Sequence, residues 1–129
     1  MEDPVARILP FIPAFLWAAL LLYIGGRSTV PTVNTTLPLD KAAHFVMYGI
    51  LGALATLGWL RARRSARPAP KLLWVLVLAM SVGLLDEVRQ RSVPARSADI
   101  YDWLADAFGV AVASTLILRY TRQGSSNAV

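Results

Sequence analysis

Charged residues divide the chain into four apolar runs, at residues 8–26, 42–60, 72–85 and 107–118. An α-helix rises about 1.5 Å per residue, so a helix needs roughly 20 residues to cross about 30 Å of hydrocarbon. The pattern therefore predicts an all-α membrane protein, a bundle of four transmembrane helices with spans at approximately 8–25, 41–60, 72–91 and 99–118. A single domain is expected to cover residues 1–129.

The composition agrees with a membrane protein. The mean hydropathy is +0.51, and 56% of the residues are hydrophobic, which is too apolar for a water-soluble fold of 129 residues. The chain has no cysteine, which excludes disulfide bonds, thiolate chemistry and cysteine-based zinc sites.

The basic residues predict orientation rather than nucleic-acid binding. The net charge is +5, but the arginines gather at the ends of apolar runs and do not form one phosphate-binding face. With four spans, eight of the 13 basic residues lie on the side of the two termini, five of them between residues 61 and 71. This excess predicts cytoplasmic termini in a multi-pass protein of the cytoplasmic (inner) membrane.

Most acidic residues fall on the opposite, outer side. Six of the eight are predicted there: Asp40, Asp86, Glu87, Asp99, Asp102 and Asp106. Because the third and fourth apolar runs are shorter than a bilayer, helices that cross it carry several of these acids into the outer leaflet.

The outer-side polar residues recur at helical spacing. They form three stripes: Asp40, His44 and Tyr48 on the second helix, Asp86 and Gln90 on the third, and Asp99, Asp102 and Asp106 on the fourth. A carboxylate that faces lipid is costly, so we expect the three stripes to face one another around a polar pocket.

His44 is the only histidine, and it has three interpretations. It is a structural hydrogen-bonding group, a general acid or base that contacts substrate, or a metal ligand. Nearby carboxylates suit a cation, but the chain offers no second histidine and no cysteine, so the sequence assigns no metal and no cofactor.

Asp86 and Glu87 are adjacent, so their side chains leave the helix about 100° apart. We expect one to face the helix at 41–60 and the other to face the last helix or the loop before it. Each carboxylate either positions an amine or a hydroxyl of a ligand, or forms an ion pair with Lys41, Arg89 or Arg96.

Arg96 has the strongest claim to ligand contact, because a guanidinium beside a helix N-terminus suits phosphate or carboxylate groups. Its alternative is an ion pair with Asp99 or Asp102. These two acids also have the spacing of an N-cap and a third helical residue, so helix capping is their alternative role. Asp106 lies too deep to cap the helix.

Together these residues resemble the VanZ-like family, over roughly residues 38–113. The pattern is Asp40-Lys41-x-x-His44-x-x-x-Tyr48, then Asp86-Glu87-x-x-Gln90-x-x-x-Pro94-x-Arg96-x-x-Asp99-x-x-Asp102-x-x-x-Asp106-x-x-Gly109. The chain departs from the family at Ala95, where Pro-Gly-Arg is usual, at Asp106, where Asn is frequent, and at Ala113, where glycine is common.

The resemblance implies a small bacterial four-span protein of the cell envelope, in a family named for a protein that raises teicoplanin resistance. We therefore expect an outward-facing pocket that engages a membrane lipid, lipid-linked or cell-wall precursor headgroup, with Asp40, Lys41, Tyr48, Asp86, Gln90, Arg96, Asp99, Asp102 and Asp106 as binding residues. The alternative is a membrane-embedded hydrolase or transferase that acts on an amphiphile, with His44 and Glu87 as acid and base. The sequence leaves both open.

Overall fold

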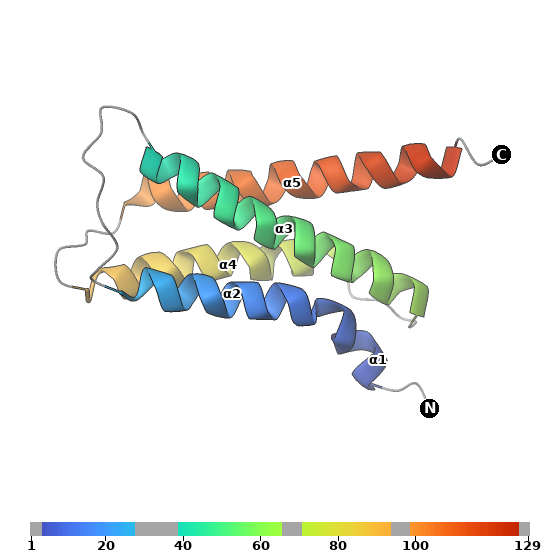
Figure 1. Cartoon of the computed structure of the whole chain (residues 1–129), viewed down its shortest axis with the longest axis horizontal. Coiled ribbons are helices and arrows are strands. Elements are labelled where there is room, and N and C mark those ends of the chain that lie inside the picture. Colours follow the sequence, from blue (N-terminus) through green and yellow to red (C-terminus); the bar gives the residue numbers. More distant parts are fainter. Residues whose placement is uncertain (1–3, 28–38, 66–70, 94–98, 127–129) are drawn as a thin grey trace.

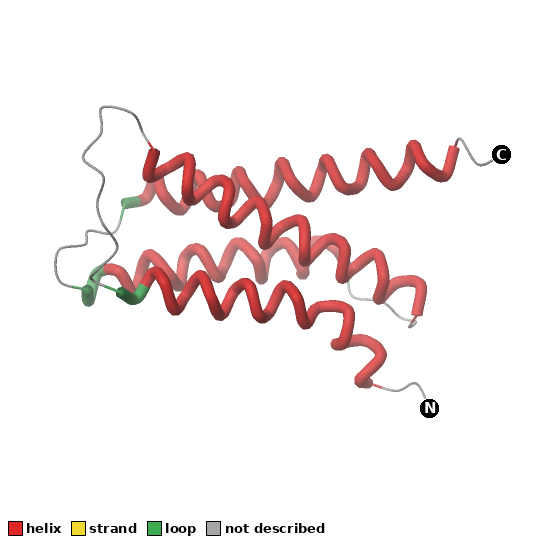
Figure 2. Tube along the Cα trace, viewed as in Figure 1, coloured by secondary structure: helices red, strands yellow, loops and turns green. Residues whose placement is uncertain are grey.

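The computed structural model describes residues 4–27, 39–65, 71–93 and 99–126, and these ranges are almost entirely helical. In chain order the elements are α1 (Pro4–Ile8), the 3-10 turn η1 (Leu9–Phe11), α2 (Ile12–Gly25), α3 (Leu39–Ser65), α4 (Leu72–Gln90) and α5 (Ile100–Ser126) (Figure 1). Figure 2 shows no strand among the described residues, so the all-α prediction is confirmed.

Two prolines shape the N-terminal helices. Pro10 lies in η1, and Pro13 lies in the first turn of α2. Proline has no backbone N–H to donate to the preceding turn, so the helical hydrogen-bond ladder is interrupted here and the chain passes through a 3-10 turn. The predicted first helix is therefore divided into α1, η1 and α2, and it ends at Gly25.

The helices α3 and α5 continue beyond the spans predicted for them. Their last residues are Ser65 and Ser126, whereas the apolar runs end at Leu60 and Leu118. Arginine and glutamine are good helix formers, so the basic segments prolong the helix after the apolar run has ended. Apolar runs mark the part of a helix suited to lipid rather than the whole helix.

By length and composition, two helices within the described ranges are suited to cross a membrane. They are the segments Leu39–Arg64 of α3 and Ile100–Gln123 of α5. The N-terminal apolar helix, Leu9–Gly25, is shorter. α4 has a charged last turn and a half, which contains Asp86, Glu87 and Arg89.

α3 is the central helix of the bundle. It packs against α5 along much of its length and also contacts α2 and α4. As Figure 1 shows, α3 and α5 begin at the end of the bundle where α2 and α4 finish. The start of α1 and the end of α5 lie at the opposite end.

Glycines allow α3 and α5 to approach closely. A Cβ added to Gly52 would lie 2.7 Å from the Cα of Val110, and one added to Gly109 would overlap the carbonyl oxygen of Phe45. Gly49 is less tightly enclosed, because the nearest atom to its added Cβ is 3.5 Å away. Small residues at such crossings permit backbone contact between membrane helices.

These glycines give a prediction with a control inside the same interface. Gly109→Ala forces α3 and α5 apart and should lower the free energy of unfolding by about 1–3 kcal/mol, the usual cost of overpacking. Gly49→Ala should change it little, since its added methyl meets only ordinary van der Waals contacts. Unfolding in detergent micelles, followed by circular dichroism, measures both. Equal stability of the two variants would contradict the close packing.

Candidate functional site

Polar side chains are buried together at the end of the bundle where α3 and α5 begin and α4 ends. Five titratable or amide side chains are at most 5% exposed there: Asp86, Glu87, Gln90, Asp102 and Asp106. Tyr48 is 2% exposed, and His44 is half-buried between them. These seven residues, with Lys41 and Asp99 at their rim, are called the polar cluster below.

Lys41 connects the start of α3 to the start of α5. Its Nζ donates to Asp99 Oδ2 and to Asp102 Oδ1, both at 2.8 Å. The Asp102 side chain is 7% exposed, whereas the side chains of Lys41 and Asp99 are 38% and 36% exposed. The ammonium group therefore compensates one buried carboxylate from the solvent edge of the cluster.

Asp99 also caps α5. Its Oδ1 accepts a hydrogen bond from the Tyr101 backbone N–H at 2.9 Å, two residues into the helix. The Lys41 ammonium, assisted by this N–H, holds the pKa of the Asp99 carboxyl below its ordinary value. Asp99 and Asp102 both accept hydrogen bonds from Lys41, and Asp99 caps the helix as well, so the two acids differ in function despite their regular spacing.

His44 faces the deepest acid of the cluster. Its Nδ1 lies 2.9 Å from Asp106 Oδ1, and Asp106 is fully buried. A carboxylate on one ring nitrogen fixes the orientation of the imidazole and leaves the other nitrogen directed elsewhere. Sequence spacing alone connected His44 to Asp40 and Tyr48, which share its helix, whereas its hydrogen-bond partner comes from α5.

Asp86 and Glu87 face different neighbours. Asp86 Oδ2 accepts from the Tyr48 hydroxyl of α3 at 3.4 Å and from Gln90 Nε2 at 3.2 Å. Glu87 Oε2 accepts from the Asp99 backbone N–H at 2.9 Å, just before α5. The adjacent acids thus hold α3 and the start of α5 against α4, as their angular separation on the helix requires.

Some buried carboxylate oxygens in the cluster have no hydrogen-bond partner among the described residues. Glu87 Oε1 and Asp106 Oδ2 are of this kind. A Cβ added to Gly83 would lie 2.8 Å from Asp106 Oδ2, so this oxygen points at α4, one turn before Glu87. Buried acceptors without donors are energetically costly. Gly83 and Glu87 are four residues apart, so both oxygens lie at the same face of α4.

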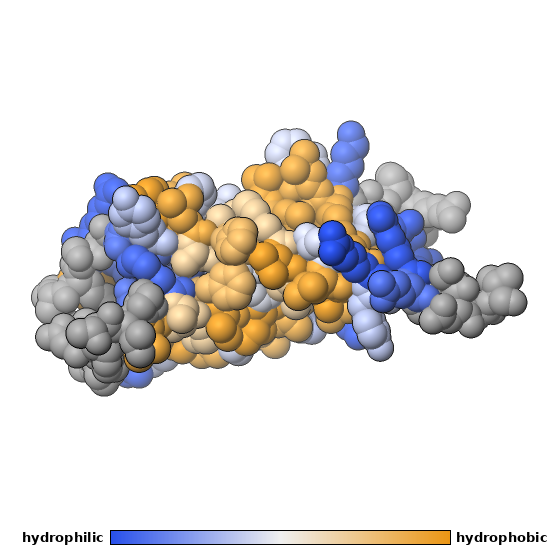
Figure 3. Space-filling model, turned by 90° about the horizontal axis from the view of Figure 1, so that it is seen from above, coloured by the Kyte–Doolittle hydropathy of each residue, from blue (hydrophilic) through white to orange (hydrophobic). Residues whose placement is uncertain are grey.

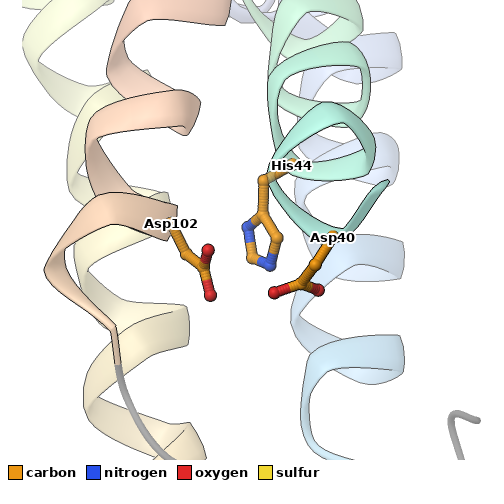
Figure 4. Close-up of side chains that lie close together, drawn as sticks. All are labelled: Asp40, His44 and Asp102. Atoms are coloured by element: carbon orange, nitrogen blue, oxygen red, sulfur yellow. The ribbon is translucent and has the colours of Figure 1, made fainter. Parts of the chain in front are cut away.

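The ligand atoms of the cluster form two groups that could hold a cation. Asp40, His44 and Asp102 make one, and His44, Glu87 and Asp106 make the other; within each group the ligand atoms lie within 4.8 Å of one another. Figure 4 shows the first group, in which the imidazole of His44 lies between the carboxylates of Asp40 and Asp102. Asp40 is exposed, so this group is at the rim.

Arg96, expected to contact ligand, lies outside the described residues. Arg89, one of the cations expected to pair with Asp86 or Glu87, donates from Nη1 to the Leu22 carbonyl oxygen of α2 at 2.8 Å. Sequence spacing also missed a second buried polar pair, Thr56 and Ser114, whose hydroxyls are 2.9 Å apart in the middle of the α3–α5 interface. Both residues are small and polar and lie within apolar runs, a pattern that can indicate helix–helix contacts in membrane proteins.

An apolar groove of about 590 Å³ lies apart from the polar cluster, between α2, α3 and α4. Phe11, Ala14 and Ala18 line it from the N-terminal helices, and Leu51 and Ala79 from α3 and α4. No residue of the polar cluster lines it. The chain therefore separates a polar site near one end from an apolar groove along its side.

Comparison with known proteins identifies one family. The family model described as VanZ/LLP1 matches residues 4–121. No curated protein and no solved structure matches the chain. The match includes α1 to α4, most of α5 and all of the residues of the polar cluster.

The contact of Lys41 with Asp102 gives a stability prediction. Lys41→Met leaves a buried carboxylate without its cation, so the free energy of unfolding in micelles should fall by about 1–3 kcal/mol. This loss is smaller than that for a fully buried ion pair, because water partly screens the exposed lysine. Lys71→Met, at the other lysine of the chain, is the control and should have little effect, since Lys71 is exposed. Adding Asp102→Asn to Lys41→Met should restore part of the loss. Equal effects of the two lysine variants would contradict this role.

Proposed function

This chain belongs to the VanZ/LLP1 family, and we propose that it is a four-span protein of the cytoplasmic membrane. We propose further that its polar cluster opens to the outer surface and engages the headgroup of a lipid-linked or cell-wall precursor. We propose that this contact with the headgroup lowers susceptibility to glycopeptides such as teicoplanin. The observation that carries the proposal is the burial of several carboxylates at one end of an otherwise apolar bundle.

The outer surface of the bundle supports insertion in a bilayer. Large apolar side chains face outward on every helix, with exposed fractions of 67% for Leu16, 56% for Val46, 67% for Leu78 and 65% for Phe108. The face in Figure 3 is apolar in its middle and hydrophilic near both ends. Such a surface is unsuited to water and matches a hydrocarbon layer between two polar regions.

The four-span arrangement follows from the parallel course of the helices. α2 and α4 lie beside α3 in the apolar part of the bundle, so a membrane that contains α3 and α5 also contains them. The 19 residues of α4 extend about 28 Å at the usual rise of an α-helix. The polar last turns of α4 are tolerated because Asp86, Glu87 and Gln90 are buried against α3 and α5.

The charges of the two ends support the outward direction of the cluster. Arg61, Arg63 and Arg64 lie at the end of α3 that is remote from the cluster, and Lys71 precedes α4 at that same end. Concentrated positive charge is retained on the cytoplasmic side of membranes. The cluster then faces the outside, where cell-wall precursors are used.

The chemistry of the cluster supports a headgroup rich in donors. Carboxylates accept hydrogen bonds from hydroxyl and ammonium groups, which sugars and amino acids of cell-wall precursors supply. Lys41, 38% exposed at the rim, offers a cation to a phosphate that links such a headgroup to its lipid. Arg96 is proposed for the same purpose on the sequence argument, and the apolar groove between α2, α3 and α4 has room for a lipid chain.

A second candidate function, a hydrolase or transferase that acts on an amphiphile, is favoured by one observation. His44 is oriented by Asp106, and one of its ring nitrogens lies within 4.8 Å of a carboxylate oxygen of Glu87. This arrangement is suited to acid–base catalysis. Incubation of the purified protein with radiolabelled lipid-linked precursors separates the two functions: binding without a new product supports the first, and a product that Glu87→Gln abolishes supports the enzyme.

The topology gives a direct test, because the chain has no cysteine. Ser92→Cys, in the exposed turn after α4, should react with a membrane-impermeant maleimide in intact cells. Lys71→Cys, at the opposite end of α4, should react only after the membrane is permeabilised. Labelling of residue 71 but not of residue 92 in intact cells would reverse the proposed orientation.

The phenotype gives a second test. Expression of the chain in a teicoplanin-susceptible bacterium should raise the inhibitory concentration of teicoplanin several-fold, and Glu87→Gln should remove this effect by losing a buried carboxylate of the cluster. Val88→Ala, on the exposed face of the same helix turn, is the matched control and should retain it. Immunoblots of membranes establish that the three proteins are present in equal amounts. Retained protection by the Glu87 variant would refute a role of the cluster.

A further inference from the structure

We propose that His44, Glu87 and Asp106 form a binding site for one divalent transition-metal ion, of the Zn²⁺ or Mn²⁺ class. The three side chains come from α3, α4 and α5, and their ligand atoms lie within 4.8 Å of one another. The inference deepens the proposed function by placing a cation at the base of the same polar cluster.

The charge of the cluster calls for a cation. Four carboxylates are at most 5% exposed, those of Asp86, Glu87, Asp102 and Asp106, and Lys41 contacts only Asp102 among them. Isolated buried carboxylates are strongly disfavoured and are usually paired or bound to metal ions. One divalent cation beside Glu87 and Asp106 supplies two positive charges at a place where His44 is the neighbouring basic group.

Two of the three side chains each carry a buried oxygen that has no hydrogen-bond partner among the described residues. Glu87 Oε1 and Asp106 Oδ2 are buried and without a hydrogen-bond partner among the described residues, although the other oxygen of each carboxylate accepts a hydrogen bond or contacts His44. A hydrogen-bonded carboxylate with one free oxygen is the usual state of a ligating Asp or Glu, whose second oxygen is held by its surroundings. A bound cation accounts for both of these oxygens at once.

The donor set selects the class of ion. One imidazole and two carboxylates suit Zn²⁺ or Mn²⁺, whereas Mg²⁺ and Ca²⁺ prefer oxygen ligands alone. Donors at about 2.1 Å from a tetrahedral ion are about 3.4 Å apart, so ligand atoms that now lie within 4.8 Å of one another move together by up to about 1.4 Å on binding.

The rim group of Asp40, His44 and Asp102 is the weaker competitor. Asp102 Oδ1 already accepts the Lys41 ammonium at 2.8 Å, so a metal ion would have to lie beside a fixed positive charge. Asp40 is exposed and gains less by neutralisation. The two groups share His44, so variants of the carboxylates distinguish them.

The test uses the full chain purified in detergent micelles without a histidine tag and dialysed against a chelator. Isothermal titration with ZnCl₂ should give one site per chain, and the electron paramagnetic resonance signal of free Mn²⁺ should fall on addition of protein. Zn²⁺ or Mn²⁺ should also raise the melting temperature by several degrees, because an ion that binds only the folded chain stabilises it.

Variants decide which residues bind the ion. Glu87→Gln, Asp106→Asn and His44→Gln should each weaken binding about tenfold or more. Asp40→Asn, the matched control at the rim, should bind as the unaltered chain does. Circular dichroism and gel filtration establish that each variant is folded. If Asp106→Asn fails to fold, Glu87→Gln decides, since Glu87 does not contact His44 in the hydrogen-bond network described above.

Several results would overturn the proposal. They are the absence of Zn²⁺ and Mn²⁺ binding up to millimolar concentration, binding that the Glu87 and Asp106 variants leave unchanged, loss of binding on Asp40→Asn alone, and a response to Mg²⁺ or Ca²⁺ only. These measurements depend neither on membrane orientation nor on glycopeptide susceptibility. A failed topology or susceptibility test with intact metal binding therefore refutes the proposed function and leaves the metal site standing.

Discussion

The structure depends on how four carboxylates are compensated within an apolar bundle. Each of them is buried where α3, α4 and α5 meet, and a bare carboxylate in that setting would cost several kcal/mol. The groups that contact them are a lysine, a tyrosine, an amide, a backbone N–H and the imidazole of His44. Helix positions and charge compensation are therefore determined together, and displacement of α3, α4 or α5 removes a contact from at least one acid.

Close packing of α3 on α5 is what makes this compensation available. Gly52 and Gly109 let the two backbones meet, and this brings His44 within 2.9 Å of Asp106. Further along the same interface, Thr56 and Ser114 meet with their hydroxyls 2.9 Å apart. Glycine contacts thus position the polar cluster, although they take no part in its chemistry.

The helices and the polar stripes could be predicted from the sequence, because apolar runs and a spacing of three or four residues are local properties. The adjacency of Asp86 and Glu87 already required two different neighbours. Partners across helices could not be predicted, since spacing within one helix says nothing about rotation of the next. His44 therefore matched Asp40 and Tyr48 in the sequence but Asp106 in the structure. The ends of α3 and α5 were missed because the polar residues after each apolar run are still good helix formers.

The polar cluster differs from the other buried polar contact of the α3–α5 interface in a way that stability alone does not explain. Thr56 and Ser114 are buried in the same interface and satisfy each other as a neutral pair, which joins two helices without introducing charge. The cluster instead uses ionisable groups and leaves Glu87 Oε1 and Asp106 Oδ2 without a donor among the described residues. Buried charges seldom stabilise a fold better than apolar side chains of similar size would. The bundle thus contains costly buried charges at one end, whereas a neutral pair of hydroxyls joins its middle. The charged end is suited to binding a charged ligand.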